Sequence, residues 1–219
     1  MKHIFTLIAA LAVLALATVT PTRYSLPRPA QSVRPLIAAI FDHSTGTSPL
    51  RNTCTVSSVG QSLWLTAAHC VFDTNTETPE RYPGLMQIEG HDVSVTAVNF
   101  TYDVILVTTP GFSIPALKMT SRGPTYQDVL HIWGYPDGTD DVMVFDGIVA
   151  SPAFHAREKV VLLTTLPVAR GNSGSPVLNT HDQLVSMTIF GNATNDRVSI
   201  LSGGVSFDDL TTFLHPFLK

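Results

Sequence analysis

A serine set among small residues, in G-N-S-G-S-P at positions 171–176, has the surroundings that a nucleophile requires. Small neighbours allow a substrate carbonyl to approach the backbone closely. A serine hydroxyl attacks poorly at its own pKa, so Ser173 would need a base within hydrogen-bond reach and a third group that orients this base. We therefore predict Ser173 as a nucleophile whose partners lie elsewhere in the chain.

Two upstream segments contain residues of the right types. His69, within T-A-A-H-C at 66–70, can serve as the base, and Asp103, within T-Y-D-V-I-L-V at 101–107, can orient it. Alone, His69 could be a core histidine and Ser173 a turn serine. Asp103 is the least specific member, because an aspartate before a strand can also cap a turn, and Asp73 and Asp92 are the alternatives.

The chain order His, Asp, Ser, together with the motifs around His69 and Ser173, resembles the trypsin/chymotrypsin-like serine peptidases over about residues 36–219. G-N-S-G-S-P and the upstream G-Y-P at 134–136 look closer to bacterial glutamyl-endopeptidase-like and HtrA-like members. The resemblance implies an all-β fold of two six-stranded antiparallel β-barrels with a short C-terminal helix. It also implies hydrolysis of peptide bonds through an acyl-enzyme, in a cleft between the barrels.

Further site residues follow from the same resemblance. The backbone N–H groups of Gly171 and Ser173 are expected to form the oxyanion hole. The segments flanking the nucleophile are expected to bind substrate, and the candidate residues in them are Thr165, Val168, Thr188, Phe190 and Gly191. No carboxylate lies in these segments, and Glu-specific members carry a histidine where Thr188 aligns. We therefore expect a neutral, medium-sized residue before the cleaved bond.

One position departs from the trypsin-like pattern. Zymogens of that type carry an aspartate directly before the nucleophile, where it pairs with a new N-terminal amine, whereas this chain has Asn172. A neutral amide cannot form that ion pair. We expect the loop around Ser173 to be held by its own hydrogen bonds, with activity that does not depend on one particular N-terminus.

Cys54 and Cys70 are the only cysteines, and an even number in an exported chain favours a disulfide over a metal site. The family often carries a bridge that fixes the loop before the catalytic histidine, while two buried thiols are the alternative. The remaining histidines show no metal-ligand spacing, so neither a metal nor a cofactor is expected; they are His43, His91, His131, His155, His181 and His215.

Composition agrees with a β-rich globular protein. The 219 residues are 44% apolar, with 14 glycines and 15 prolines, which allows a substantial core but is too rich in turn formers for a mainly helical fold. The formal charge is −4 and no cluster of Lys and Arg is present. A nucleic-acid partner is therefore not expected, and the predicted partner is a protein or peptide substrate.

The first 35 residues are expected to precede the folded body. Residues 1–17 have the short apolar run and small-residue site of a secretory signal peptide, which predicts a secreted or periplasmic protein. An uncleaved membrane anchor extending to Val19 is the alternative. Residues 18–35, with four prolines among Thr, Ser and Arg, are predicted to be a linker or short propeptide.

Short β-branched runs then follow at close spacing in two groups separated by a proline-marked connection. The groups predict a first barrel at 36–115, containing His69 and Asp103, and a second barrel at 116–219, containing Ser173. A helix is predicted at 208–214, with Ser206 as its N-cap.

Two other functions remain open: a catalytically silent binding or scaffold protein on the same fold, and an esterase that uses the same triad.

Overall fold

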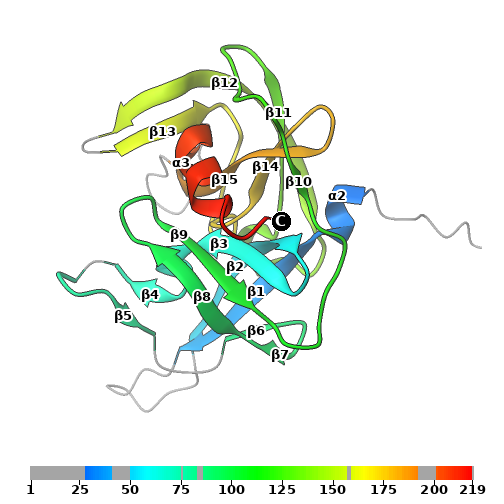
Figure 1. Cartoon of the computed structure of the whole chain (residues 1–219), viewed down its shortest axis with the longest axis vertical. Coiled ribbons are helices and arrows are strands. Elements are labelled where there is room, and N and C mark those ends of the chain that lie inside the picture. The colour runs from blue at the N-terminus through cyan, green and yellow to red at the C-terminus, as the bar shows by residue number, and fades with distance from the viewer. Residues whose placement is uncertain are drawn as a thin grey trace, which may run out of the picture.

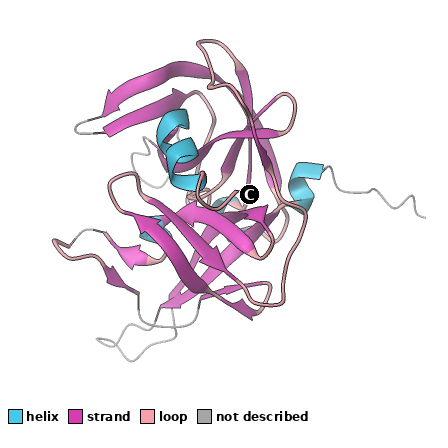
Figure 2. Cartoon of the chain, viewed as in Figure 1, coloured by secondary structure: helices cyan, strands magenta, loops and turns pink. Residues whose placement is uncertain are grey.

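The computed structural model describes residues 28–40, 50–74, 76–82, 86–156, 159–191 and 201–218. Strands predominate in these ranges, with two short α-helices, α2 (Arg28–Gln31) and α3 (Phe207–Leu214) (Figure 2). The strands form two large sheets that curl into two halves of the molecule (Figure 1). The predicted all-β, two-barrel fold is thereby confirmed.

The first sheet has the order β7-β6-β1-β2-β3-β9-β8, and every pairing in it is antiparallel. Its strands are β1 (Val33–Ile40), β2 (Leu50–Gly60), β3 (Leu63–Ala67), β6 (Met86–Ile88), β7 (His91–Asp92), β8 (Ser94–Asn99) and β9 (Val104–Thr108). A separate two-stranded sheet joins β4 (Phe72–Asp73) and β5 (Glu80–Arg81).

The first sheet contains one strand more than the six that the sequence predicted. The extra strand is the two-residue β7, which pairs with β6 through a tight hairpin. Glu89 and Gly90 connect the two strands, and both have positive φ, at 52° and 78°. Two consecutive residues with positive φ are typical of a type I′ hairpin turn, which suits the twist of the strands on either side.

The second sheet has the order β10-β15-β14-β11-β12-β13-β16. Its strands are β10 (Lys118–Met119), β11 (Val129–Gly134), β12 (Met143–Ala156), β13 (Lys159–Thr164), β14 (Pro176–Asn179), β15 (Gln183–Gly191) and β16 (Ser202–Val205). Because β15 also pairs with β16, six antiparallel strands close into a barrel. The short β10 is added to this barrel as a parallel partner of β15.

Apolar packing joins the two halves. One core cluster combines first-sheet residues such as Trp64 and Leu106 with Leu184 and Ile189 of β15 and with Leu210 of α3. A second cluster fills the interior of the closed barrel between β11, β12, β13, β14 and β15. The predicted boundary at residues 115 and 116 falls between β9 and β10, so the two halves follow one another along the chain.

Helix α3 begins one residue earlier than predicted and ends where expected. The Ser206 hydroxyl accepts a hydrogen bond from the Asp209 N–H at 3.2 Å, which satisfies one of the free donors of the first turn. Leu210 and Leu214, four residues apart, bury one face of the helix against the larger core cluster. The predicted N-cap is confirmed.

The segment at 18–35, predicted to be a linker or short propeptide, is structured from residue 28 onward. Residues 28–31 form α2, and β1 begins at Val33, three residues before the predicted start of the body. Ala30 and Val33 are buried, and the ladder with β2 extends to the pair Val33 and Ser57. The pairing with β2 orders a segment that composition alone left unstructured. Residues 1–27 lie outside the described part of the chain.

Pro35 fits this strand because β1 has only one partner there. The pairing with β6 begins at Leu36, so the missing N–H of Pro35 removes no ladder bond on that side.

Among the described residues, no helix combines the length and apolar character that a membrane crossing requires.

Candidate active site

Strand register brings His69 and Asp103 together. Strand β3 is fully buried and leads into the 3₁₀ helix η1 (Ala68–Cys70), which carries His69. Strands β3 and β9 are antiparallel, and Ala67 pairs with Val104. The residues that follow β3 therefore lie beside the residue that precedes β9, which is Asp103.

Asp103 contacts His69 at two points. Its Oδ1 accepts a hydrogen bond from the His69 backbone N–H at 2.8 Å, and its Oδ2 lies 2.6 Å from His69 Nδ1. The Asp103 carbonyl also accepts from the Ala68 N–H at 3.1 Å. Asp103 has φ of +56°, an uncommon conformation for a residue other than glycine and one found more often at functional sites.

The alternative aspartates lie on other strands. Asp92 lies on β7 and accepts a hydrogen bond from the Gln87 side chain, and Asp73 lies on β4. A second His–Asp pair, His131 and Asp146 at 2.6 Å, joins neighbouring positions of β11 and β12. Asp146 is 72% exposed there, so this pair lies on the surface of the second barrel.

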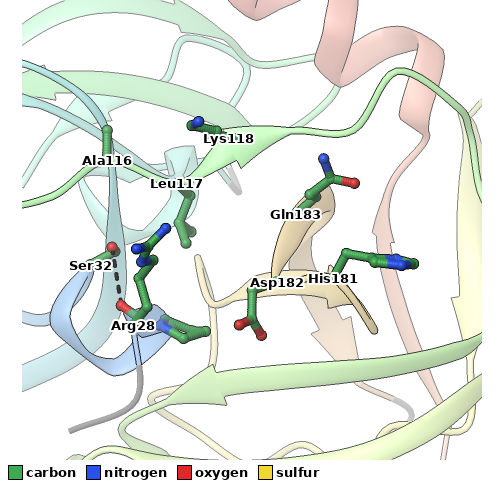
Figure 3. Close-up of a pocket in the computed structure, with 9 residues that line it drawn as sticks. Arg28, Ser32, Ala116, Leu117, Lys118, His181, Asp182 and Gln183 are labelled. Atoms are coloured by element: carbon green, nitrogen blue, oxygen red, sulfur yellow. Dashed lines mark hydrogen bonds between the residues drawn. The ribbon is translucent and has the colours of Figure 1, made fainter. Parts of the chain in front are cut away.

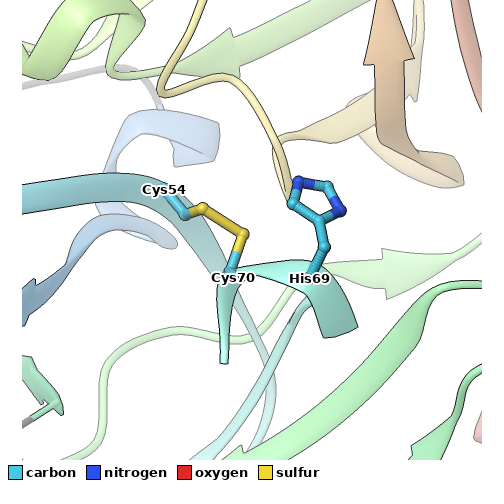
Figure 4. Close-up of side chains that lie close together, drawn as sticks. All are labelled: Cys54, His69 and Cys70. Carbon is cyan, nitrogen blue, oxygen red and sulfur yellow. A yellow bond between two sulfur atoms is a disulfide. The ribbon is translucent and has the colours of Figure 1, made fainter. Parts of the chain in front are cut away.

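Cys54 and Cys70 form the predicted disulfide, which links β2 to the residue after His69 (Figure 4). Their sulfur atoms and a ring nitrogen of His69 lie within 4.8 Å of one another, a spacing that by itself could indicate a metal site. Metal ligation requires a thiolate, and both sulfur atoms are used in the disulfide. The bridge therefore serves to fix η1 against β2.

The loop that carries Ser173 comes from the second barrel, between β13 and β14, and contacts β2 of the first. The Thr55 N–H donates to the Ser173 carbonyl at 2.8 Å. Thr55 directly follows Cys54, whose disulfide partner follows His69, so this contact brings Ser173 to the segment that holds the histidine. Ser173 is half-buried, whereas its neighbours 171, 172, 174 and 175 are buried.

The same loop requires glycine at two positions. Gly171 and Gly174 have φ of +88° and +83°, which other residues rarely adopt. A Cβ atom at Gly171 would overlap the Tyr135 carbonyl oxygen, and one at Gly174 would overlap the Thr55 carbonyl oxygen and the Thr66 hydroxyl. The loop therefore packs closely against both barrels only because Gly171 and Gly174 have no side chain.

The N–H groups of Gly171 and Ser173 can bind an oxyanion. No acceptor in the described part of the chain takes either of them, whereas the intervening Asn172 N–H donates to the Ala169 carbonyl at 3.2 Å and the Gly174 N–H to Thr188 at 2.8 Å. Backbone donors of this kind, fixed before reaction, stabilise the negative charge that develops on a carbonyl oxygen during attack.

The five predicted substrate-binding residues do not form one group. Thr188, Phe190 and Gly191 lie on β15, and Thr188 pairs with the nucleophile loop through its backbone N–H and carbonyl. Thr165 is bonded instead to Ile148 of β12, and Val168 packs in the core of the second barrel. Thr188 therefore contacts the loop, and Phe190 and Gly191 follow it on the same strand.

Tyr135 and Asp137 contribute to the site although the sequence marked neither as functional. Asp137, in the 3₁₀ helix η2 (Pro136–Gly138), donates its N–H to the Arg170 carbonyl at 2.6 Å. Tyr135 is 6% exposed, and burial raises the pKa of its hydroxyl, which donates to the Val33 carbonyl at 3.4 Å. In the sequence, only the G-Y-P motif at 134–136 drew attention to this region. It supported the family resemblance but did not predict a contact with the Ser173 loop.

A separate cavity of about 270 Å³ lies where α2, the segment before β10 and the β14–β15 turn meet (Figure 3). Arg28, Lys118, His181, Asp182 and Gln183 are among the residues that line it. It shares no residue with the His69 and Ser173 segments, so we do not assign it to substrate binding at that site.

Comparison with known proteins agrees with this geometry. A family model described as the trypsin-like peptidase domain matches residues 52–187, well over half of the chain. No curated protein matches the chain in sequence.

Solved structures share the fold. The active form of the Rv3671c protease from M. tuberculosis is 16% identical with a TM-score of 0.68, and the match covers 85% of this chain and 81% of that one. An HtrA-type protease, AlgW with a tripeptide, is 15% identical with a TM-score of 0.67, and the match covers 88% of this chain but only 62% of that one. The chain belongs to the trypsin-like peptidase family and is a serine peptidase, a hydrolase.

Proposed function

We propose that the chain is an endopeptidase that cleaves peptide bonds through an acyl-enzyme formed on Ser173. His69 removes the proton from the Ser173 hydroxyl as the hydroxyl attacks the substrate carbonyl, and later returns it to the leaving amine. Asp103 holds the imidazole and stabilises its charged form. The N–H groups of Gly171 and Ser173 stabilise the oxyanion.

The observation that carries this proposal is the double contact between Asp103 and His69. With a proton on Nδ1 facing Oδ2, the imidazole leaves Nε2 as the basic nitrogen. The backbone contact from Thr55 to Ser173 supports the position of the nucleophile beside this pair. The mechanism requires no metal or cofactor.

A fluorophosphonate probe tests the nucleophile on purified mature protein. We expect the wild type to be labelled and Ser173→Ala to lose the label. Ser175→Ala, which removes the other hydroxyl of the same loop, serves as the matched control and should keep the label. Labelling of Ser173→Ala would contradict the proposal because the probe would then react with another residue. No labelling of folded wild type would also contradict it and would favour a silent binding protein.

Casein cleavage, measured in parallel, separates a peptidase from an esterase. We expect the wild type to cleave casein and the Ser173→Ala variant not to cleave it. Turnover of an ester substrate without casein cleavage would instead indicate the esterase function, because both reactions use the same acyl-enzyme.

We propose that substrate binds along β15 at Thr188, Phe190 and Gly191, with a neutral, medium-sized residue before the cleaved bond. Phe190 is 41% exposed, and its ring lies against Gly203 on the neighbouring strand, where a Cβ would overlap it. A digest of a peptide library gives the preference directly. Products dominated by cleavage after Glu, Lys or Arg would contradict it.

We also propose that the protein is exported, with residues 1–17 as the signal peptide and a protein or peptide as its partner. The apolar run and small-residue site of this segment support the proposal. Sequencing the N-terminus of protein recovered from the culture medium or periplasm tests it, and retention of Met1 in a membrane fraction would favour an anchor.

A further inference from the structure

Thr55 belongs to β2 of the first barrel, but its side chain binds the second barrel at two points. Its Oγ1 donates to the Gly171 carbonyl at 2.8 Å and accepts from the Tyr135 N–H at 3.1 Å. The residue has no exposed surface. Both contacts are therefore made away from water, where leaving either backbone group unpaired costs the most.

The main chain of Thr55 adds two further bonds. Its N–H donates to the Ser173 carbonyl at 2.8 Å, and its carbonyl accepts from the Thr66 hydroxyl of β3 at 2.8 Å. Gly171 and Ser173 are the two residues whose N–H groups we propose as the oxyanion hole. The carbonyls of both thus accept hydrogen bonds from Thr55. Thr66 in turn holds that residue in place.

Two hydrogen bonds, one from the Asp137 N–H and one from the Thr55 hydroxyl, determine which way the Gly171 N–H points. It belongs to the peptide unit whose carbonyl, at Arg170, accepts from the Asp137 N–H. The N–H and C=O of a trans peptide point in opposite directions, so the Gly171 N–H points away from Asp137. The next peptide unit is fixed by Thr55 at the Gly171 carbonyl. Rotation about either side of Gly171 therefore breaks one of the two bonds.

Such a hold is needed because glycine itself does not restrict the rotation. The neighbouring Asn172 carries a neutral amide and is 1% exposed, so this position cannot supply an ion pair to fix the loop. The loop is thus held by partners from both barrels, and not only by its own hydrogen bonds as the sequence suggested.

We propose that Thr55 is a positioning residue whose hydroxyl keeps the Gly171 N–H directed at the oxyanion, so that the site is assembled without an activating ion pair. The inference rests on the proposed function, since it concerns the oxyanion hole of the same site. Thr55 acts through Gly171 and does not touch the reacting atoms.

The test compares Thr55→Val, Thr55→Ser and Thr109→Val. Thr55→Val removes the hydroxyl with little change of shape, and Thr55→Ser keeps it. Thr109 is a matched control on the same barrel: it too is fully buried, donates to one backbone carbonyl, that of Phe112, and accepts one N–H, that of Trp64. Both valine variants thus remove the partner of one N–H donor and of one backbone carbonyl.

We expect Thr55→Val to lower kcat by about 10- to 100-fold, with KM within about twofold of wild type, because the oxyanion contact forms only in the transition state. Affinity for a peptide boronate, which places a negatively charged oxygen in the same position, should fall by a similar factor. Thr55→Ser and Thr109→Val should keep kcat near the wild-type value, and the pH profile of kcat should not move.

Equal kcat values for Thr55→Val and Thr109→Val would overturn the role of Thr55, as would a rise in KM at constant kcat. Wild type and Ser173→Ala are measured in the same series. A wild type with no turnover would overturn the proposed function and the role of Thr55 with it, whereas an active wild type with an equally active Thr55→Val overturns only the latter.

Discussion

The carboxylate of Asp103 binds both the main chain and the ring of His69, at 2.8 Å and 2.6 Å. The two contacts fix the position of the backbone and the rotation of the imidazole together. The side chains of His69 and Asp103 are only 32% and 17% exposed, so water competes weakly for either bond.

Replacement of Asp103 by asparagine tests this relationship. An amide can present its N–H₂ group to Nδ1 and so favour the wrong tautomer, and we expect kcat to fall by about 10,000-fold. Activity against a peptide ester and circular dichroism measure the chemistry and the fold. Asp92→Asn, at the alternative position, should keep full activity, and equal losses in both variants would contradict the assignment.

Gly171→Ala should fold but lose most of its activity. A Cβ at this position would overlap the Tyr135 carbonyl oxygen, so the loop must shift and misplace the oxyanion donor, which lowers kcat by about 100- to 1,000-fold. Gly111→Ala is the matched control: Gly111 has a similar φ of +79°, but no atom lies within 4 Å of the added Cβ. If both variants lose activity equally, backbone strain and not the close fit is the cause.

Removal of the disulfide should destabilise the protein. The bridge closes a loop with a sequence separation of 16. In the chain-entropy model, the double variant Cys54→Ala/Cys70→Ala should lose about 3 kcal/mol in the free energy of unfolding. Urea denaturation of the variant and of the oxidised wild type measures the difference. An unchanged midpoint would show that the bridge adds nothing beyond the packing around it.

We expect the buried hydroxyl of Tyr135 to make the protein less stable at alkaline pH. Burial raises the pKa of its hydroxyl in the folded state above the ordinary value, which is about 10. The unfolded chain therefore releases this proton first, so the stabilisation is complete below about pH 10 and decreases as the pH rises toward the folded pKa. Denaturation midpoints at pH 7 and above pH 10 should show a smaller alkaline loss for Tyr135→Phe. An identical pH dependence would contradict the prediction.

Motifs around His69 and Ser173 were sufficient to predict the family and the fold, because a nucleophile, a base and their small neighbours leave a local pattern. The strand-length apolar runs predicted the two groups of strands. The even cysteine count with the family resemblance predicted the bridge between Cys54 and Cys70. Each of these predictions depends on residue type and short-range spacing, which the sequence contains directly.

Other features depended on contacts between distant segments. The register of β3 and β9 placed Asp103 beside His69, whereas Asp73 and Asp92 lie on other strands. Pairing with β2 ordered residues 33–35, which composition assigned to a linker or short propeptide.

The sequence by itself determined the family, the all-β class and the candidate residues for chemistry. Only the tertiary structure decided which aspartate contacts the histidine, where the body begins, and that Thr55 of one barrel holds the loop of the other. The physical reason is that hydrogen bonds across 34 or 116 residues of sequence depend on strand register and barrel packing, which no local pattern of residue types records.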